Sequence, residues 1–213
     1  MKTVAATCAG LLAVVSLAAG SANALLISPD GATASSRHSG SFDPRFTIDG
    51  SGLPVNFTAA DAHADYASNN HWTAANGDLL NADITWTFNN PQSLSAIVIW
   101  NHRSNGFAAN PGYDVTSFDL TVRDQSNNIL LHWDDMALQP NVATGQTLSF
   151  GSMLNGVSSV LFEVEAVESS TTWTGLAEVA FDDTIITSAV PVGASLPLLA
   201  TGLAAFAAVR RRT

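Results

Sequence analysis

Two polar loops carry most of the side chains that could bind a small organic ligand. The first runs from Asp65 to Trp72 and the second from Asn101 to Tyr113. Aromatic faces beside neutral hydrogen-bonding groups suit sugar rings, and an arginine adds a planar set of donors that fits sugar oxygens or carboxylates. The candidate ligand-binding residues are Tyr66, His71, Asn101, His102, Arg103 and Tyr113. The alternative is that both histidines are ordinary surface or hydrogen-bonded residues; Trp72 is expected in the core.

Two carboxylates stand at positions that suit a calcium ligand. Asp49 precedes Gly50 at an expected turn, and Glu178 interrupts an apolar run near the end of the folded region. Calcium is bound by six to eight oxygens from carboxylates and backbone carbonyls. The alternative is that Asp49 caps the turn and that Glu178 faces water from the polar side of a strand.

The sequence lacks the patterns that accompany common hydrolytic chemistry. The histidines form no His-Glu-x-x-His motif, and no Gly-x-Ser-x-Gly turn is present. The carboxylate pairs Asp134-Asp135 and Asp182-Asp183 are adjacent, so on a strand their members point to opposite faces. His63 with Asp61 and Asp65 is the one cluster of metal-ligand character. We therefore expect a protein that is not an enzyme.

The composition of residues 25–189 excludes several partners. All 18 acidic residues lie in this segment with only four of the basic ones, so its formal net charge is −14. Such a surface repels phosphate backbones and anionic lipids, which argues against nucleic-acid and peripheral membrane binding. The only cysteine, Cys8, precedes this segment, which therefore has no disulfide, thiol nucleophile or zinc thiolate.

Residues 1–24 are expected to form a secretory signal peptide. Lys2 supplies the basic start, a stretch of small and apolar residues follows, and Ala22-Asn23-Ala24 is a small-residue cleavage motif. Cleavage by signal peptidase is expected after Ala24.

Residues 190–213 have the composition of a sorting signal. The segment begins with Val190 and Pro191, continues with an apolar run from Leu196 to Val209, and ends with three arginines before the last residue. The run is shorter than the ~20 residues that span a bilayer comfortably, and the arginines are expected to stay on the cytoplasmic side. A plain C-terminal membrane anchor is the alternative. Residues 184–189 are the expected linker before this segment.

This C-terminal segment resembles the PEP-CTERM class of bacterial tails, in the variant whose signature reads VPLPA. Here the motif reads VPVGAS, so Gly193 replaces the second proline of the signature. The resemblance implies recognition by an exosortase-type protease at or near Val190-Pro191. It also implies transient anchoring in the inner membrane through a C-terminal transmembrane helix and delivery to the cell surface or the extracellular matrix.

Residues 25–183 are predicted to form one all-β domain. Apolar and polar residues alternate at 84–88, 118–123, 160–165 and 177–181, and polar turns separate the runs. Leu94 to Trp100 is almost continuously apolar, as expected of a central strand covered on both faces. No stretch has a convincing period of 3.6 residues, so the pattern predicts an antiparallel sandwich or barrel.

The order of these elements resembles the discoidin family, which includes coagulation-factor type C domains and related galactose-binding-like modules. The segments that carry the resemblance are, in order, Ala32 to Ser36, Ile48-Asp49-Gly50, His71-Trp72, Ile84 to Phe88, Ile97 to Asn101, the hairpin Val115 to Trp133, and the strand pair Val160 to Val167 and Gly175 to Phe181. The last of them reads GLAEVAF. The resemblance implies an eight-stranded antiparallel jelly-roll sandwich with ligand loops at one end.

The same resemblance implies a structural calcium ion. In related modules the positions that match Asp49 and Glu178 meet where the first loop touches the last strand. Carried over to this sequence, both side chains would bind Ca²⁺ together with the carbonyl of Ala177 and that of Phe46 or Ser51.

These features together predict an exported, non-catalytic module that binds an extracellular polysaccharide or glycan through its loop end. The second hypothesis is a structural matrix or biofilm protein with protein partners and no small ligand. The third is a polysaccharide-active enzyme.

Overall fold

The computed structural model describes residues 26–102, 112–170 and 172–184 of the 213-residue chain. The expected signal peptide, residues 1–24, and the expected sorting segment, residues 190–213, lie outside this part. Within the described ranges no helix is long and apolar enough to cross a bilayer.

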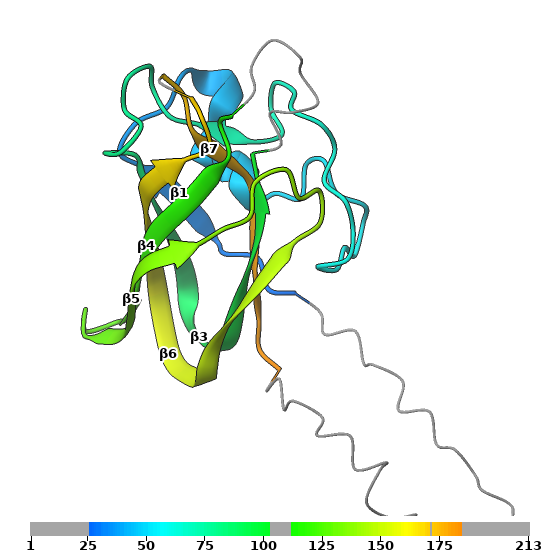
Figure 1. Cartoon of the computed structure of the whole chain (residues 1–213). Coiled ribbons are helices and arrows are strands. Elements are labelled where there is room, and N and C mark those ends of the chain that lie inside the picture. Colours follow the sequence, from blue (N-terminus) through cyan, green and yellow to red (C-terminus); the bar gives the residue numbers. More distant parts are fainter. Residues whose placement is uncertain (1–25, 103–111, 171, 185–213) are drawn as a thin grey trace, which may run out of the picture.

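The described residues fold into an antiparallel β-sandwich with two short 3₁₀ turns at one end (Figure 1). The elements are β1 (Gly31–Ala34), η1 (Gly40–Phe42), η2 (Pro44–Thr47), β2 (Trp72–Thr73), β3 (Asp83–Asn101), β4 (Val115–Asp124), β5 (Ile129–Ala137), β6 (Gln146–Val167) and β7 (Gly175–Asp182). The strands are hydrogen-bonded in the order β2-β7-β3-β6-β4-β5, and β1 pairs with the first half of β3.

Two long strands connect the layers of the sandwich. The first half of β3 pairs with β1 and with the second half of β6, whereas its last residues pair with β7 and with the start of β6. The two apolar runs expected as separate strands, 84–88 and 94–100, are therefore one strand. The polar triplet Asn89-Asn90-Pro91 is an exposed irregularity within that strand, where the pairing with β6 shifts register between Thr87 and Gln92. The described part of the chain holds seven strands, and the resemblance implies eight for the whole domain.

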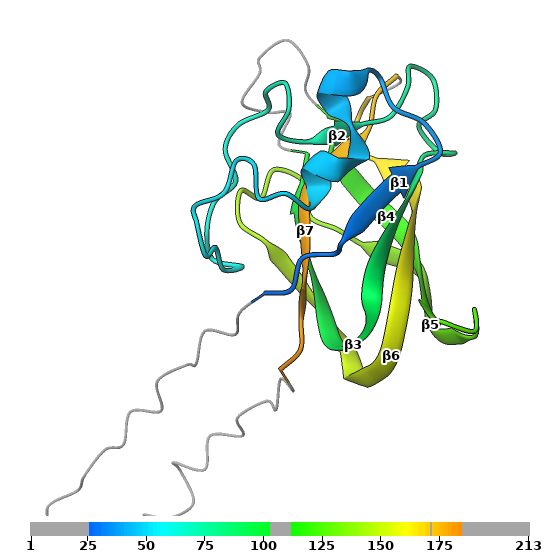
Figure 2. The same cartoon turned by 180° about the vertical axis from the view of Figure 1, so that it is seen from behind.

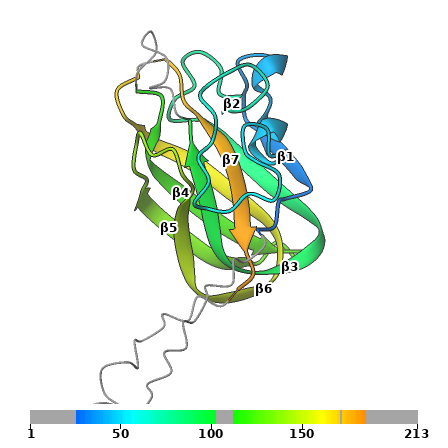
Figure 3. The same cartoon turned by 90° about the vertical axis from the view of Figure 1, so that its right-hand side faces the viewer.

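The predicted hairpin is present as β4 and β5, which pair along their length. The two runs expected as a final strand pair, in β6 and β7, are consecutive in sequence but do not pair. Instead β7 lies between β2 and β3, and β6 lies between β3 and β4 (Figure 3). Alternation of apolar and polar residues indicates which face of a strand is buried. It does not indicate which other strand lies beside it.

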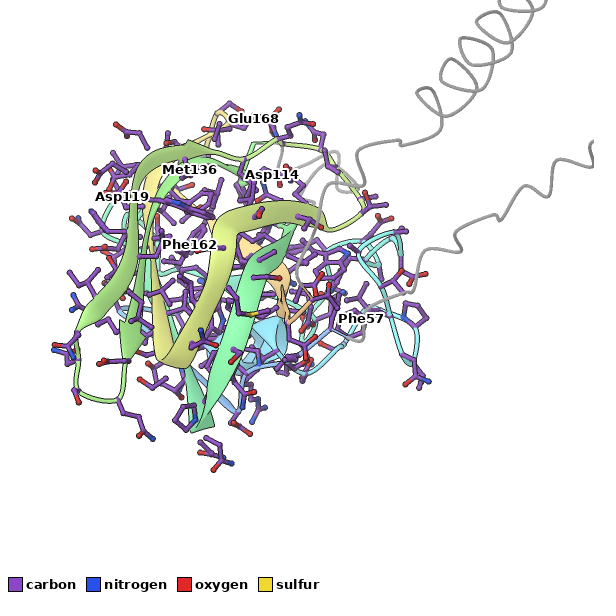
Figure 4. All side chains as sticks on the ribbon, turned by 90° about the horizontal axis from the view of Figure 1, so that it is seen from below. Phe57, Asp114, Asp119, Met136, Phe162 and Glu168 are labelled. Carbon is purple, nitrogen blue, oxygen red and sulfur yellow. The ribbon has the colours of Figure 1, made fainter. Side chains whose placement is uncertain are left out.

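The main core fills the space between the layers. It contains four tryptophan or phenylalanine pairs in edge or stacked contact, among them Trp86 with Phe162 and Phe118 with Phe162. Trp72 is fully buried, as predicted. Figure 4 looks along the sandwich and shows Phe162 in its interior.

A smaller core covers the outer face of β3 and β7. Val98 and Trp100 pack there against Phe57 from the loop that follows Gly50, and Trp100 Nε1 donates a hydrogen bond to the carbonyl of Asp61 at 2.9 Å. The predicted burial of Leu94 to Trp100 on both faces is thereby confirmed. All core residues lie between Leu26 and Phe181, so a fragment of residues 25–189 keeps both cores intact.

The chain enters and leaves the sandwich away from the 3₁₀ turns (Figure 2). Ile27 forms a two-way backbone bridge with Phe181 near the end of β7, with N···O distances of 2.7 and 2.8 Å. The 3₁₀ turns η1 and η2 and the strand β2 lie at the other end, which we call the loop end (Figure 2).

Candidate functional site

Four of the six predicted ligand-binding residues meet in one cluster at the loop end. Tyr66 lies over His71 with 4.0 Å between ring centroids, and 5.0 Å from His102. The two imidazole rings are 4.7 Å apart and nearly perpendicular, and His102 contacts Tyr113 at 5.5 Å. The four rings come from three segments of the chain, namely the loop before β2, the end of β3 and the residues before β4. We call them the imidazole–tyrosine cluster.

Hydrogen bonds from neighbouring residues fix both imidazole rings. His71 Nδ1 donates to Asn70 Oδ1 at 2.7 Å, and Asn70 is itself held by the amide of Ala67 and the carbonyl of Asp65. His102 Nε2 shares a hydrogen bond of 3.1 Å with the hydroxyl of Thr73 in β2. The remaining nitrogens, His71 Nε2 and His102 Nδ1, are buried without a hydrogen-bond partner among the described residues.

Burial keeps the cluster uncharged at neutral pH. Burial, with a smaller effect from His63, lowers the pKa of His71 to about 3. The pKa of His102 is held well below its usual value by burial, His71 and His63. Burial also raises the pKa of Tyr66 and of Tyr113. The cluster is therefore a neutral aromatic group in which Tyr66 is half-buried and the other three rings are buried.

The other two predicted ligand residues stand apart from this cluster. Asn101 is fully buried, and its side chain pairs with the backbone of Val115 as a strand residue would: Nδ2 donates to the carbonyl at 2.8 Å and Oδ1 accepts from the amide at 3.0 Å. Oδ1 also accepts from the backbone of His102. Asn101 thus positions His102 and the start of β4. Arg103 lies outside the described residues.

Three aromatic residues that the sequence did not single out extend the cluster. Phe42 of η1 stacks on Tyr66 at 5.8 Å with an angle of 18°, and also contacts His71 at 5.0 Å. His38 lies between Phe42 and Trp173, at 5.3 and 4.4 Å. Phe42, Tyr66 and Trp173 are half-buried, so part of each ring reaches solvent. In the sequence each of them is a single aromatic residue in a polar loop, and no hydrophobic periodicity singles it out.

A groove of about 410 Å³ adjoins this aromatic group. Residues 32–37 line it together with Asp43 and Pro44, and Arg37 forms an ion pair with Asp43 inside it. Two of the lining residues, Arg37 and Asp43, are the sequence neighbours of His38 and Phe42. None of the predicted ligand residues lines the groove.

A second polar site joins the turn after Asp49 to β7. Glu178 is fully buried, and its Oε2 accepts a hydrogen bond from the amide of Gly50 at 3.0 Å. Its Oε1 is buried without a hydrogen-bond partner among the described residues. The expectation that Glu178 faces water is therefore wrong, because β7 is buried along its whole length. Asp49 is exposed, and its Oδ1 accepts from the amide of Ser51 at 2.8 Å, as in the turn-capping alternative.

Burial first, and the neighbouring Asp49 second, raise the pKa of Glu178 to about 9, against a smaller opposing effect of the Gly50 amide. Among residues 26–102, 112–170 and 172–184, no three His, Cys, Asp or Glu side chains come together to hold a metal. A calcium ion at this site would thus depend on backbone carbonyls for most of its ligands, as calcium commonly does. The carboxylates of Asp49 and Glu178 fit such an ion, since the Oε1 atom of Glu178 is buried without a hydrogen-bond partner among the described residues.

The remaining carboxylates make other contacts. Asp61 accepts from the amide and the hydroxyl of Thr58, and His63 is hydrogen-bonded to the carbonyl of Ala64. Asp134 pairs with His132 at 2.8 Å, and Asp182 accepts from Thr184. The cluster of His63 with Asp61 and Asp65, considered in the sequence for metal binding, is not among groups that could hold an ion.

No protein-family model matches this sequence, and no curated protein is similar to it. Solved structures share its fold at low sequence identity. A Streptococcus pneumoniae fucose binding module superposes with a TM-score of 0.52 and 17% identity, over 76% of this chain and 96% of that one. An F5/8 type C domain from Bacteroides fragilis superposes with a TM-score of 0.51 and 12% identity, over 78% of this chain and 99% of that one. The lectin domain of lectinolysin, complexed with Lewis B antigen, superposes with a TM-score of 0.50 and 16% identity, over 73% of this chain and 93% of that one. The described domain thus shares the β-sandwich fold of these structures.

Proposed function

We propose that this chain is an exported glycan-binding module without catalytic activity, and that its ligand binds at the loop end. One observation carries the proposal: Tyr66, His71, His102 and Tyr113 converge from separate segments into a neutral aromatic cluster. None of these four rings belongs to the main hydrophobic core.

The accessible part of the cluster supports a sugar ligand. The half-buried rings of Phe42, Tyr66 and Trp173 offer apolar faces on which the C–H side of a pyranose can pack. The tyrosine hydroxyl can donate to or accept from a sugar hydroxyl. Arg103, which follows His102 directly in the sequence, is proposed as an additional donor.

The compared structures agree with a carbohydrate ligand, since one is described as a fucose binding module and another is complexed with Lewis B antigen. At 16–17% identity they support the fold, and the ligand of this chain is inferred from its own cluster.

A glycan array with the 25–189 fragment tests the proposal. We expect binding to a restricted set of neutral glycans that Tyr66→Ala removes. Ile129→Ala is the matched control, because it shortens an exposed side chain on β5, outside the cluster. An array without binding, both with and without calcium, would leave the structural matrix protein with protein partners as the better hypothesis.

We further propose a structural calcium ion between the first loop and β7. Asp49 and Glu178 would supply side-chain oxygens, and Ala177 with Phe46 or Ser51 would supply carbonyls. The support is the buried, unpartnered Oε1 of Glu178 and its proximity to a second carboxylate. A divalent cation would favour ionised Glu178 and remove the cost of burying it.

Sorting is proposed from the sequence alone. Signal peptidase would remove residues 1–24, and an exosortase-type enzyme would cut near Val190-Pro191, leaving the domain at the cell surface or in the extracellular matrix. The intact mass of the surface form tests both cleavages.

A further inference from the structure

The two histidines of the imidazole–tyrosine cluster are an unusual pair to find beneath a loop. Both side chains are only 1% exposed, and their rings are 4.7 Å apart. One nitrogen of each ring is used, by Asn70 Oδ1 and by the Thr73 hydroxyl. If either ring took up a second proton, the new N–H group would need a further acceptor.

Protonation of either ring is therefore costly in the closed structure. A protonated imidazole has two N–H donors. His71 Nε2 and His102 Nδ1 have no hydrogen-bond partner among the described residues, so the added N–H would be buried with its positive charge. A buried, unsatisfied charged donor is among the more expensive groups in a protein.

Among the described residues, no carboxylate favours the charged form of either ring. The loop before β2 contributes His63, Asp65 and Tyr66, and the residues before β4 contribute Tyr113 and Asp114. His63 disfavours charge on both rings, and no carboxylate acts to raise either pKa. The carbonyl of Asp65 is held by Asn70, and Asp114 Oδ2 accepts from the amide of Asn141.

The other described neighbours of the pair contribute no carboxylate either. The 3₁₀ turn η1 presents Phe42, and the imidazole of His38 lies behind it. β2 presents Thr73, and Gly175 at the start of β7 lies against the His102 ring. Among the described residues, a backbone hydrogen bond at Ala67 favours the charged form of His71 and opposes part of the effect of burial on its pKa.

We propose that the His71–His102 pair makes the loop end acid-labile: in mildly acidic medium the pair takes up protons by releasing the 63–71 loop, which takes Tyr66 away from the cluster. The contacts that would open include those of Tyr66 with Phe42, His71 and His102 and the backbone hydrogen bond from the amide of Asn69 to the carbonyl of Ser41 at 2.8 Å. At the start of the loop the amides of His63 and Ala64 donate to the carbonyls of Ala143 and Gly52. The consequence for ligand binding rests on the proposed function, since a glycan bound against Tyr66 would be released with the loop.

The sign of the effect follows from linkage. An exposed histidine has a pKa of ~6.5, whereas His71 in the closed structure has a pKa of about 3. The closed state is fully stabilised above the exposed value and loses stability as pH falls below it. Each such histidine changes the opening equilibrium about tenfold per pH unit, so the pair gives up to about a hundredfold per unit.

Hydrogen exchange of the 25–189 fragment without any glycan tests the proposal. Protection factors, which remove the intrinsic pH dependence of exchange, are compared at pH 7.5, 6.0, 5.0 and 4.5. We expect the amides of residues 63–71 to lose protection by about ten- to a hundredfold per unit below pH 6, while the core of β3 and β6 keeps its protection. In His71→Phe, which keeps a ring against Tyr66 but cannot titrate, this loss should be clearly smaller. His132→Gln is the matched control, because His132 is an exposed histidine on β5, and should behave as the wild type does.

A second measurement keeps the proposal falsifiable if His71→Phe does not fold. Ring ¹⁵N shifts of the wild-type histidines should report neutral imidazoles in the closed state at pH 5. Titration of the pair near the ordinary histidine value with undiminished protection of 63–71 overturns the proposal. Because no glycan is used, this result is independent of the array: glycan binding with a pH-insensitive loop rejects acid lability alone, whereas an acid-labile loop with an empty array rejects the glycan function alone.

Discussion

Glu178 in β7 accepts a hydrogen bond from the backbone amide of Gly50, 128 residues earlier, at a distance of 3.0 Å. This contact joins the turn after Asp49 to a strand that is buried along its whole length. One oxygen of the same carboxylate has no hydrogen-bond partner among the described residues. The pair of residues thus links the long first loop to the sheet through a group that needs either a proton or a cation.

Calcium should stabilise the domain through this carboxylate. At a hundredfold excess over Kd, binding to the folded state contributes about 2.7 kcal/mol, which for this size corresponds to a rise in Tm of roughly 5–10 °C. Asp49→Ala and Glu178→Ala should each abolish the rise, because each removes a ligand and negative charge. Glu165→Gln, on an exposed side chain of β6, is the control and should keep it. Thermal unfolding in calcium and in chelator measures the shift, and equal Tm values in both would reject the ion.

Without calcium, the stability contributed by Glu178 should fall as pH rises. Its folded pKa of about 9 lies above the ordinary glutamate value. Its contribution is therefore fully present below the ordinary value and is lost as pH rises toward 9. Chelated wild type should lose stability from pH 5 to 9, and Glu178→Gln should lose less. Urea titrations at several pH values compare the two, and parallel pH profiles would contradict the assignment.

Calcium binding should also release a proton. Since the buried carboxylate is protonated near neutrality and the ion binds its ionised form, affinity should rise with pH. Calorimetric titrations at pH 7 in buffers of different ionisation enthalpy should report up to one proton released per ion. Titrations that give the same heat in all buffers would show that Glu178 is ionised before the ion binds.

Replacement of Asn101 should destabilise the domain rather than remove a ligand contact. Its amide bonds both backbone groups of Val115 and the backbone of His102. Asn101→Leu leaves these buried groups unpaired, which should cost about 3 kcal/mol. Asn90→Ala, at the exposed irregularity of β3, is the control and should cost less than about 0.5 kcal/mol. Urea unfolding measures both, and a small effect of Asn101→Leu would mean that Val115 finds other partners.

Arg103→Ala should separate the two proposed sites. It is expected to weaken glycan binding and to leave the calcium-induced rise in Tm unchanged, because Arg103 is not among the residues proposed to bind calcium; it follows β3 in the sequence, whereas Glu178 lies within β7. The same protein sample can be used for glycan binding and for thermal unfolding. Loss of the calcium effect in this variant would indicate that the sites are coupled.

The strand pattern predicted much of the fold and less of its connectivity. Alternation in Phe162 and Val164, and the apolar run before Trp100, correctly indicated inward-facing strands. The break expected at Asn89 to Pro91 was wrong, since polar residues also suit an exposed irregularity within a strand. The position of β7 between β2 and β3 depends on contacts between distant segments, which local periodicity does not encode.

The candidate site was predicted in part for the same reason. Residue type pointed to Tyr66 and His102, and the structure brings them together. Phe42 and Trp173 join them only because η1 and the segment before β7 reach the same end of the sandwich. Neither the burial of Glu178 nor the strand-like pairing of Asn101 could be read from residue type, because both depend on which strand lies alongside.

Calorimetric titration of an array-positive glycan into wild type, Tyr66→Ala and Ile129→Ala tests the central claim most directly. Loss of the ring that stacks on Phe42 and contacts His71 should weaken binding by about tenfold or more, while Ile129→Ala should bind as the wild type does. Unchanged affinity of Tyr66→Ala, in a variant whose unfolding shows it to be native, would contradict a glycan site at the loop end.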